Sequence, residues 1–156
     1  MIEIDIPGVG VRRFQHAVFD VNGTLAKDGV LLRGVASLLA ALRGKLEVHL
    51  VTADTHGTRP TIELELGLPV VCIPTNDQAR AKLDYIVRLD PETVVAVGNG
   101  ANDALMLKRA ALGILVIGPE GAAVSALNGA TVVVNRIDEA LKLLLYPKRL
   151  IATLRQ

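Results

Sequence analysis

Short apolar runs typical of buried strands alternate along the chain with segments whose apolar residues recur at helical spacing. Elements that alternate in this way, joined by short loops, build a parallel sheet whose crossover helices cover both faces. The runs expected to be strands are residues 17–21, 46–51, 70–73, 93–97, 112–117 and 131–134. We therefore predict a doubly wound α/β fold, in which a parallel sheet is covered by helices on both faces.

Helix signals fill the intervals between these runs. Asn76 or Asp77, and further along the chain Asp138, are expected to cap two of the helices. Ahead of the first parallel strand, residues 2–6 and 11–14 flank a Pro-Gly turn and predict an N-terminal hairpin. The helices are expected around residues 35–42, 60–66, 79–87, 102–110, 121–127, 139–146 and 148–155.

Length and composition limit the classes of protein to consider. A chain of 156 residues, 51% of them hydrophobic, is long enough for one domain with a real core, and we expect a single domain over residues 1–156. The 17 basic and 16 acidic residues nearly cancel, which gives no reason to expect nucleic acid or an anionic membrane surface as a partner. Composition therefore favours neither of these partners.

The single cysteine and the N-terminal sequence indicate a compartment. Cys72 alone cannot form an internal disulfide or a cysteine-rich zinc site, and we expect it to be a buried apolar filler. The first residues are acidic where a signal peptide would be basic, and no apolar run reaches the ~20 residues of a membrane span. We therefore expect a cytoplasmic protein.

Polar residues follow three of the predicted strands, where ligands bind in sheets of this kind. Asp20 ends the first strand, Thr52 follows the second and Asp103 follows a later one, while Lys82 lies in the helix after the third. Taken singly, each is explained as an ordinary strand-end, surface or helix-terminal residue. Together they supply the carboxylates, hydroxyl and ammonium group that metal-assisted phosphoryl transfer requires.

The order of these residues resembles that of the four motifs of the haloacid dehalogenase (HAD) superfamily, phosphotransferases that attack phosphorus with an aspartate. The matching strings are FDVNGTL, VTADT, an isolated lysine and VGNGANDALML. The second and last strings are similar to the TGD and GDGxND motifs of P-type ATPase phosphorylation domains. The chain therefore resembles a soluble phosphorylation domain, and its short intervals between motifs leave no room for the cap domain of many HAD enzymes.

The resemblance implies roles for the matching residues. Asp20 is expected to be the nucleophile that becomes a phosphoaspartate, and Asp20, Asp103 and the main-chain carbonyl of Asn22 are expected to ligate Mg²⁺. Asn99 replaces an aspartate and is expected to hold a water on the metal without adding charge, while Asn102 is expected to orient the Asp103 loop.

The resemblance also implies a phosphate-binding set. Thr52 is expected to hydrogen-bond a phosphoryl oxygen, and Lys82 to offset the charge on Asp20 and the phosphoryl group. Loop N–H groups complete the cradle, because such groups bind anions. The full set is Thr52, Ala53, Lys82, Gly23 and Thr24.

Asn22 is the main departure from the family pattern, since phosphatases of the superfamily carry an acid–base aspartate at this position. An amide cannot transfer the proton, and such assistance is typically worth ~10²–10⁴-fold. We therefore expect slow hydrolysis of alkyl esters and a preference for good leaving groups, as in aryl phosphates or nucleotide anhydrides. Asp28, Asp54 or His56 would be the residues to substitute for the missing acid, although each is more simply explained as an exposed loop residue.

A chain without a cap is expected to have an open site, which either accepts large substrates or is covered by a second copy of the chain in a homo-oligomer. His16 and His49 lie in or beside apolar strands and are expected to be packed, hydrogen-bonded imidazoles without a catalytic role.

Three other classes of protein are alternatives to a HAD enzyme. The two amides, Asn22 and Asn99, leave open a regulatory protein that binds magnesium or phosphate without turnover. A response-regulator receiver domain is disfavoured because the first strand lacks an acidic pair. A dinucleotide-binding domain is disfavoured because Gly98 and Gly100 are not followed by the third glycine of that motif.

Overall fold

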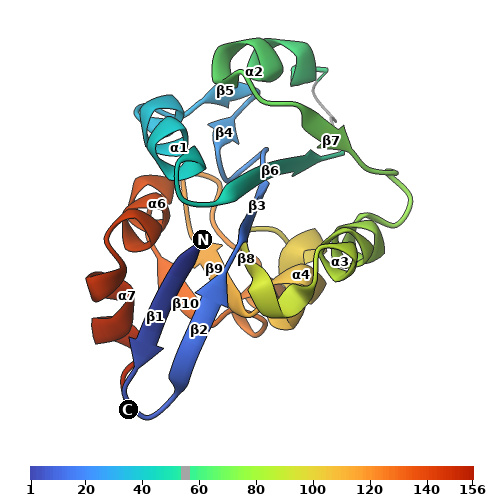
Figure 1. Ribbon diagram of the computed structural model, residues 1–156. Coiled ribbons are helices and arrows are strands. Elements are labelled where there is room, and N and C mark those ends of the chain that lie inside the picture. The colour runs from blue at the N-terminus through green and yellow to red at the C-terminus, as the bar shows by residue number, and fades with distance from the viewer. Residues whose placement is uncertain (54–56) are drawn as a thin grey trace.

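The computed structural model describes residues 1–53 and 57–156, which surround one parallel sheet of six strands (Figure 1). The strand order is β10-β9-β8-β3-β6-β7, and every neighbouring pair is parallel. The predicted doubly wound α/β fold is therefore confirmed. The strands are β3 (His16–Asp20), β6 (Glu47–Thr52), β7 (Val70–Cys72), β8 (Val94–Gly98), β9 (Leu112–Val116) and β10 (Val132–Val134).

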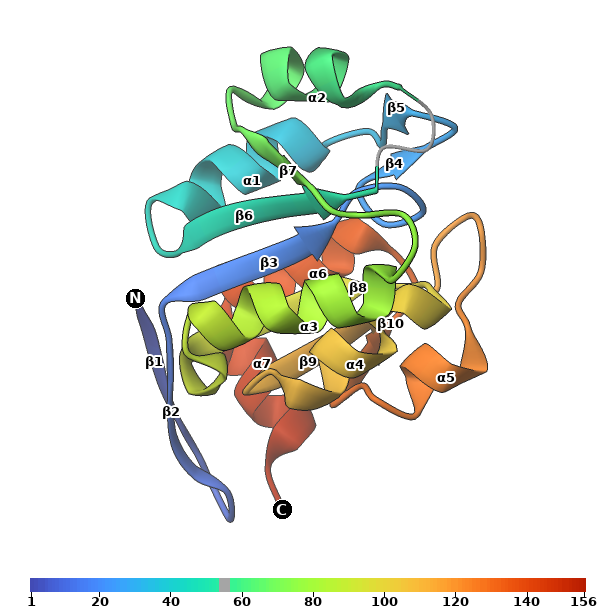
Figure 2. The same ribbon diagram turned by 90° about the vertical axis from the view of Figure 1, so that its right-hand side faces the viewer.

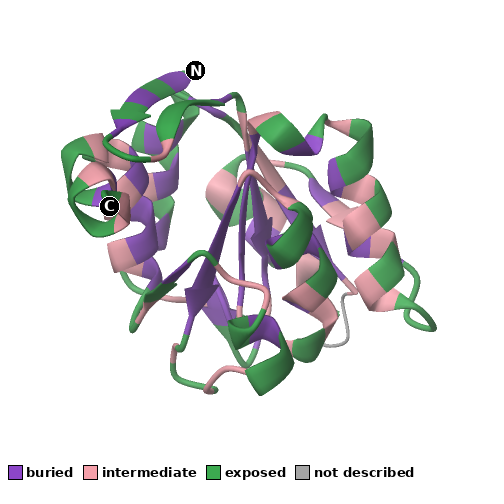
Figure 3. Ribbon diagram, turned by 90° about the horizontal axis from the view of Figure 1, so that it is seen from below, coloured by how far each residue is buried: buried purple, intermediate pink, exposed green. Residues whose placement is uncertain are grey.

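Helices cover both faces of the sheet, as seen in Figure 2. One face packs against α1 (Val35–Arg43), α6 (Ile137–Leu145) and α7 (Pro147–Leu154), and this larger core also includes Ile62 of α2 (Arg59–Leu66). The other face packs against α3 (Gln78–Arg88), α4 (Ala104–Arg109) and α5 (Val124–Leu127). Strands β8 and β9 are buried along their whole length, as parallel strands covered on both sides must be (Figure 3).

The predicted N-terminal hairpin is present as β1 (Ile2–Ile6) and β2 (Gly10–Phe14), which pair antiparallel. Every second residue of β1 points into the core, because side chains alternate along a strand. Helix α7 packs against β1, and the main chain of Gln156 donates a hydrogen bond of 3.0 Å to the Pro7 carbonyl. The hairpin thus closes the molecule at the end of the sheet opposite the predicted site.

The interval between β3 and α1 holds a small hairpin, β4 (Ala26–Lys27) and β5 (Val30–Leu31), in place of a cap domain. The interval between β6 and α3 holds α2 and β7 in its described residues. In the described part of the chain, every helix is too short or too polar to cross a bilayer.

Three local predictions were tested by the structure. Asp77 caps α3 as expected, because its carboxylate accepts the main-chain N–H of Arg80 at 3.2 Å. The prediction for Asp138 was wrong: α6 begins at Ile137 with Arg136 at its N-cap, and Asp138 lies in the first turn, bound to Arg136 and Lys142. The prediction that Cys72 is buried was also wrong, because Cys72 ends the edge strand β7 and its side chain is exposed.

Candidate active site

The candidate catalytic residues meet where the strand order of the sheet reverses. Strand β3 lies between β6 and β8, so that strands added later in the chain spread from β3 in both directions. Asp20 ends β3, and Asp103 lies in the 3₁₀ turn η2 (Ala101–Asp103) that follows β8. The crevice beyond the carboxyl ends of strands at such a reversal is where doubly wound sheets bind ligands.

The ammonium group of Lys82 joins the two carboxylates. Its Nζ lies 2.6 Å from Asp20 Oδ1 and 2.6 Å from Asp103 Oδ1. Lys82 comes from α3, and its side chain is fully buried. Asp20 Oδ1 and Asp103 Oδ1 therefore bind the same ammonium group and lie close to each other. Asp20 and Asp103, which are 83 positions apart, thus meet as the order of the sequence motifs predicted.

Main-chain groups fix the second oxygen of Asp103. Asp103 Oδ2 accepts the N–H groups of Asn99 and Gly100, each at 2.9 Å. The carboxylate folds back beneath the end of β8, where a Cβ at position 98 would lie 2.5 Å from Asp103 Cγ. Glycine is required at position 98 for this approach, because any side chain there would displace the carboxylate.

The loop after β3 supports the second oxygen of Asp20. The hydroxyl of Thr24 lies 3.2 Å from Asp20 Oδ2 and 3.2 Å from Asn99 Oδ1, so it links the two loops. Gly23 has φ of 84°, in the left-handed region that favours glycine, and a Cβ there would lie 2.8 Å from the Asn99 side-chain amide. Asn99 in turn donates to the Gly121 carbonyl at 3.0 Å.

Glu120 is a neighbour of the site that the sequence analysis missed. A Cβ at position 23 would lie 2.9 Å from its carboxylate oxygen Oε2. Glu120 belongs to none of the four motifs, and it approaches Gly23 only because the loop after β9 folds over the end of the sheet. The sequence carried no signal for this contact.

Asn22 and Thr52 form the other side of the site. The Asn22 side-chain amide donates to Thr52 Oγ1 at 3.3 Å. Its carbonyl oxygen Oδ1 is buried and has no hydrogen-bond partner among the described residues. A buried amide oxygen that lacks a partner is uncommon, and here it belongs to the residue that departs from the family motif.

Burial and charge shift the protonation of this cluster in the metal-free protein. Desolvation, reinforced by the neighbouring Asp103 carboxylate and opposed by Lys82, raises the pKa of Asp20 to about 7. Burial alone would lower the pKa of Lys82, but the attraction of Asp20 and Asp103 outweighs it and holds that pKa above its usual value. The site is thus a buried anionic pair held by one cation, a setting that a second cation would stabilise.

The donor set fits magnesium, a cation that prefers oxygen ligands. Asp20 and Asp103 present carboxylate oxygens, and the main-chain carbonyl of Asn22 and the side chain of Asn99 belong to the same two loops. Mg²⁺ usually takes one or two carboxylates and completes its shell with water and substrate phosphate. The structure therefore offers the ligand types that the sequence analysis assigned to Mg²⁺, while the individual roles stay predictions.

The remaining predicted residues divide into three groups. Ala53 directly follows β6 and is half-buried, and Asn102 bonds Gln78 of α3 at 2.6 Å, which ties the Asp103 loop to the helix that carries Lys82. Asp28 lies in the exposed turn of the β4–β5 hairpin. Asp54 and His56 lie outside the described residues.

The candidate carboxylates are less exposed than an open site would leave them. Only 8% of the Asp20 side chain is exposed, and the Asp103 side chain is fully buried. The loops after β3, β8 and β9 cover the carboxylates although the chain carries no cap. Both candidate carboxylates are therefore buried in the metal-free protein.

A cavity of about 770 Å³ lies at the same end of the sheet, beyond the loops after β9 and β10. Gly118, which lines it, packs against the Gly23 carbonyl of the candidate site. None of the candidate catalytic residues lines the cavity, so it adjoins the site without being the site. The lining residues are Leu32, Arg33, Gly34, Ser37, Leu38, Gly118, Pro119, Asn135, Arg136, Ile137, Asp138 and Lys142.

Comparison with known proteins gives a sequence relative and several structural ones. No protein-family model matches the chain. An uncharacterised protein of Methanocaldococcus jannaschii is 47% identical over 79 residues, which are 48% of this chain and 85% of that protein.

Several solved structures with the same fold are phosphatases or are described as HAD hydrolases. A hydrolase described as HAD subfamily III A, from Legionella pneumophila, has a TM-score of 0.70 at 18% identity and covers 90% of this chain and 87% of its own. The 3-deoxy-D-manno-octulosonate 8-phosphate phosphatase of Moraxella catarrhalis, solved with magnesium and phosphate, has a TM-score of 0.64 at 17% identity. The match covers 91% of this chain and 94% of the phosphatase. A phosphoserine phosphatase solved as a phospho-aspartyl intermediate analogue has a TM-score of 0.66 at 17% identity. The match covers 84% of this chain and 99% of that phosphatase.

These likenesses confirm the HAD resemblance at the level of the fold. The match extends over 87%, 94% and 99% of these three solved chains. The chain has the fold of the HAD superfamily, with no cap domain among the residues that the structure describes. Because of the sequence identity, it belongs to the same family as the uncharacterised protein of Methanocaldococcus jannaschii.

Proposed function

We propose that this protein is a magnesium-dependent phosphohydrolase that acts through a phosphoaspartate on Asp20. The observation that supports this most strongly is the Lys82 ammonium group, 2.6 Å from both Asp20 and Asp103, at the carboxyl ends of β3 and β8. Burying three charged side chains is costly, and a purely structural ion pair could form at the surface without that cost. The burial is explained if the carboxylates serve a reaction.

In the proposed reaction a carboxylate oxygen of Asp20 attacks the phosphorus of the substrate. A bond forms between that oxygen and phosphorus, and the bond from phosphorus to the leaving group breaks with its electron pair. Water then attacks phosphorus, the bond from phosphorus to the Asp20 oxygen breaks with its electron pair, and the carboxylate is regenerated. The protons of the water leave with the phosphate or pass to solvent. When Mg²⁺ is bound by Asp20, Asp103 and the Asn22 main chain, it offsets the negative charge on the phosphoryl oxygens.

The chain's own side chains orient and stabilise the phosphoryl group. Lys82 offsets its charge, as a cation close to developing negative charge does in phosphoryl transfer. Thr24 holds Asp20 in position, and the hydroxyl of Thr52 donates a hydrogen bond to a phosphoryl oxygen. Loop N–H groups around Gly23 and Ala53 add further donors.

Asn22 restricts the class of substrate. The amide cannot protonate a leaving oxygen, so the enzyme is suited to phosphate esters or anhydrides whose leaving groups need no proton. Aryl phosphates, acyl phosphates and nucleotide anhydrides fit this requirement. The physiological partner is proposed to be a phosphorylated small molecule or nucleotide, and a second copy of the chain is proposed to cover the entrance that a cap covers in larger HAD enzymes.

The test is release of phosphate from an aryl phosphate such as p-nitrophenyl phosphate, with Mg²⁺ and with chelator. We expect release that depends on Mg²⁺ and is lost in Asp20→Asn. Asp84→Asn is the matched control, because Asp84 is an exposed carboxylate on the same helix as Lys82 and forms an ion pair with Arg80 on the helix surface. Equal release by wild type and Asp20→Asn would overturn the proposal.

A second candidate function is a regulator that binds magnesium or phosphate without turnover. It is favoured by the two amides, Asn22 and Asn99, which replace the acid–base aspartate and a charged metal-site residue of the resembled motifs. Calorimetric binding of Mg²⁺ together with an absence of phosphate release would support this function over the first.

A further inference from the structure

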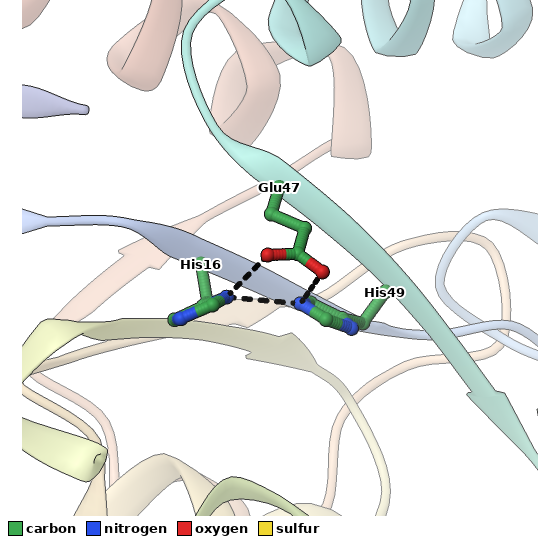
Figure 4. Close-up of side chains that lie close together, drawn as sticks. All are labelled: His16, Glu47 and His49. Carbon is green, nitrogen blue, oxygen red and sulfur yellow. Dashed lines mark hydrogen bonds and ion pairs between the residues drawn. The ribbon is translucent and has the colours of Figure 1, made fainter. Parts of the chain in front are cut away.

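A second cluster of metal-ligating side chains lies at the opposite end of the central strands. His16 begins β3, and Glu47 begins the neighbouring strand β6 directly beside it. His49 follows two residues later on β6, so its side chain lies on the same face as that of Glu47. Figure 4 shows the two imidazole rings and the carboxylate converging on one point. A strand rises ~3.3 Å per residue, which places this cluster about 13 Å along β3 from Asp20.

The distances within this cluster are those of a metal site. His16 Nδ1 lies 3.1 Å from His49 Nε2 and 3.4 Å from Glu47 Oε2, and His49 Nε2 lies 3.8 Å from Glu47 Oε1. All three ligand atoms fall within 4.8 Å of one another. Ligands about 2.0–2.1 Å from a tetrahedral zinc ion are separated from each other by ~3.3 Å, so an ion fits between these atoms with little movement.

A fourth side chain orients the cluster. The hydroxyl of Tyr85, on α3, lies 2.9 Å from His49 Nδ1. When His49 Nδ1–H donates to this hydroxyl, its Nε2 lone pair faces His16 and Glu47. Histidines that bind metals are held in this way by a partner on the other ring nitrogen.

Access and charge also suit a cation. The side chains of His16 and His49 keep 17% and 11% of their surface exposed, and that of Glu47 keeps 67%, so an ion can enter from solvent and one coordination position stays open. Two imidazoles with one carboxylate are a typical donor set for zinc and other divalent transition metals, and a poor one for Mg²⁺.

We propose that His16, Glu47 and His49 bind a divalent transition-metal ion, for which Zn²⁺ is the best fit. The ion would join the first residues of β3 and β6, and through Tyr85 it would connect both strands to α3. A ligand that binds only the folded protein stabilises it, so the metal acts as a clamp at the end of the sheet remote from Asp20.

The test is Zn²⁺ binding by competition with a chromophoric chelator. We expect one ion per wild-type chain. Glu47→Gln should weaken binding ~10-fold or more, Tyr85→Phe should weaken it ~10-fold as an orienting partner, and His49→Ala should weaken it by about 100-fold or more. Zn²⁺ should raise the midpoint of thermal unfolding of the wild type and not that of His49→Ala.

Three controls separate this site from the other metal-binding groups of the chain. Asp20→Asn, Cys72→Ser and His56→Ala should each keep wild-type zinc affinity, because they remove the candidate active site, the only thiol and the third histidine. Retained affinity in Glu47→Gln and His49→Ala, or loss in any control, would overturn the proposal. If His49→Ala fails to fold, Glu47→Gln decides the question, since its side chain is largely exposed.

Discussion

The two ends of strand β3 carry charged clusters of different construction. At its carboxyl end, Asp20 shares Lys82 with Asp103, and all three side chains are buried. At its amino end, His16 meets His49 and the exposed Glu47. The same strand thus ends in an oxygen-rich cluster on one side and a nitrogen-rich cluster on the other.

The difference follows from the topology of a parallel sheet. Loops that leave the carboxyl ends of β3 and β8 turn back over the strands and bring main-chain N–H groups to Asp103. At the amino ends of β3 and β6, His16 is half-buried and Glu47 is exposed, and only the register of the two strands places them side by side. A buried site suits reaction chemistry at phosphorus, and a shallow site suits an ion that is taken from solution.

The largest expected effect separates the two ends by function. Asp20→Asn removes the proposed nucleophile and should lower phosphate release from an aryl phosphate by at least ~10³-fold, as expected when a covalent nucleophile is lost. His49→Gln should leave the release of phosphate in Mg²⁺ within about twofold of wild type. Steady-state assays of both purified variants check this, and comparable losses in the two variants would show that the ends are not independent.

The next effect concerns the leaving group at the carboxyl end. Asn22→Asp supplies the missing acid and should raise hydrolysis of an alkyl phosphate by about 10²-fold, with a smaller gain on aryl phosphate. Rates on both substrates, compared as ratios to wild type, give the measurement. An equal gain on both substrates, or none on the alkyl ester, would contradict the role assigned to position 22.

Lys82→Met tests how much the buried cation matters to the carboxyl end. Removing one partner of a buried ion pair leaves an uncompensated charge, and such changes cost about 3–5 kcal/mol. We expect a loss of about 3 kcal/mol in the free energy of unfolding at pH 8 in chelator, and a partial recovery in Mg²⁺. Urea denaturation measures both. Lys142→Met, at a half-exposed lysine, is the control and should cost less than about 1 kcal/mol.

The two ends should respond to pH with opposite signs. Burial raises the pKa of Asp20 from 3.8 to about 7, so the metal-free folded protein binds an extra proton between those values and its stability falls as pH rises through them. Burial lowers the pKa of His49 below 6.5, assisted by His16 and opposed by Glu47, so its contribution is present above pH 6.5 and is lost as pH falls.

Urea denaturation in chelator between pH 4.5 and 8 measures both slopes, each at most about 1.4 kcal/mol per pH unit for one proton. Asp20→Asn should remove the decline toward high pH, and His49→Gln should remove the decline toward low pH. An unchanged profile in either variant would show that the named residue does not titrate as described.

Much of the carboxyl-end cluster could be predicted from sequence. Asp20 and Thr52 end strands, and Asp103 lies in the turn after another strand. The rule that strand ends share one edge brings them together without any knowledge of side-chain packing. Lys82 could be placed because its helix follows the third strand. Glu120 could not, because its approach to Gly23 depends on the path of a loop that has no motif.

The amino-end cluster shows the limit of the same reasoning. His16 and His49 were expected to be packed and hydrogen-bonded, and the 3.1 Å contact between their rings confirms this. Their meeting with Glu47 depends on the register between two strands 31 positions apart, which residue types alone do not determine. Cys72 was placed in the core for a similar reason, since its exposure depends on β7 being an edge strand.

The most direct test of the central claim is formation of a beryllofluoride adduct, which mimics a phosphoaspartate, observed by ¹⁹F nuclear magnetic resonance. The account predicts bound fluoride signals from the wild-type protein that require Mg²⁺ and are absent in Asp20→Asn. Signals that persist in Asp20→Asn, or no bound signal from wild type in Mg²⁺, would contradict it.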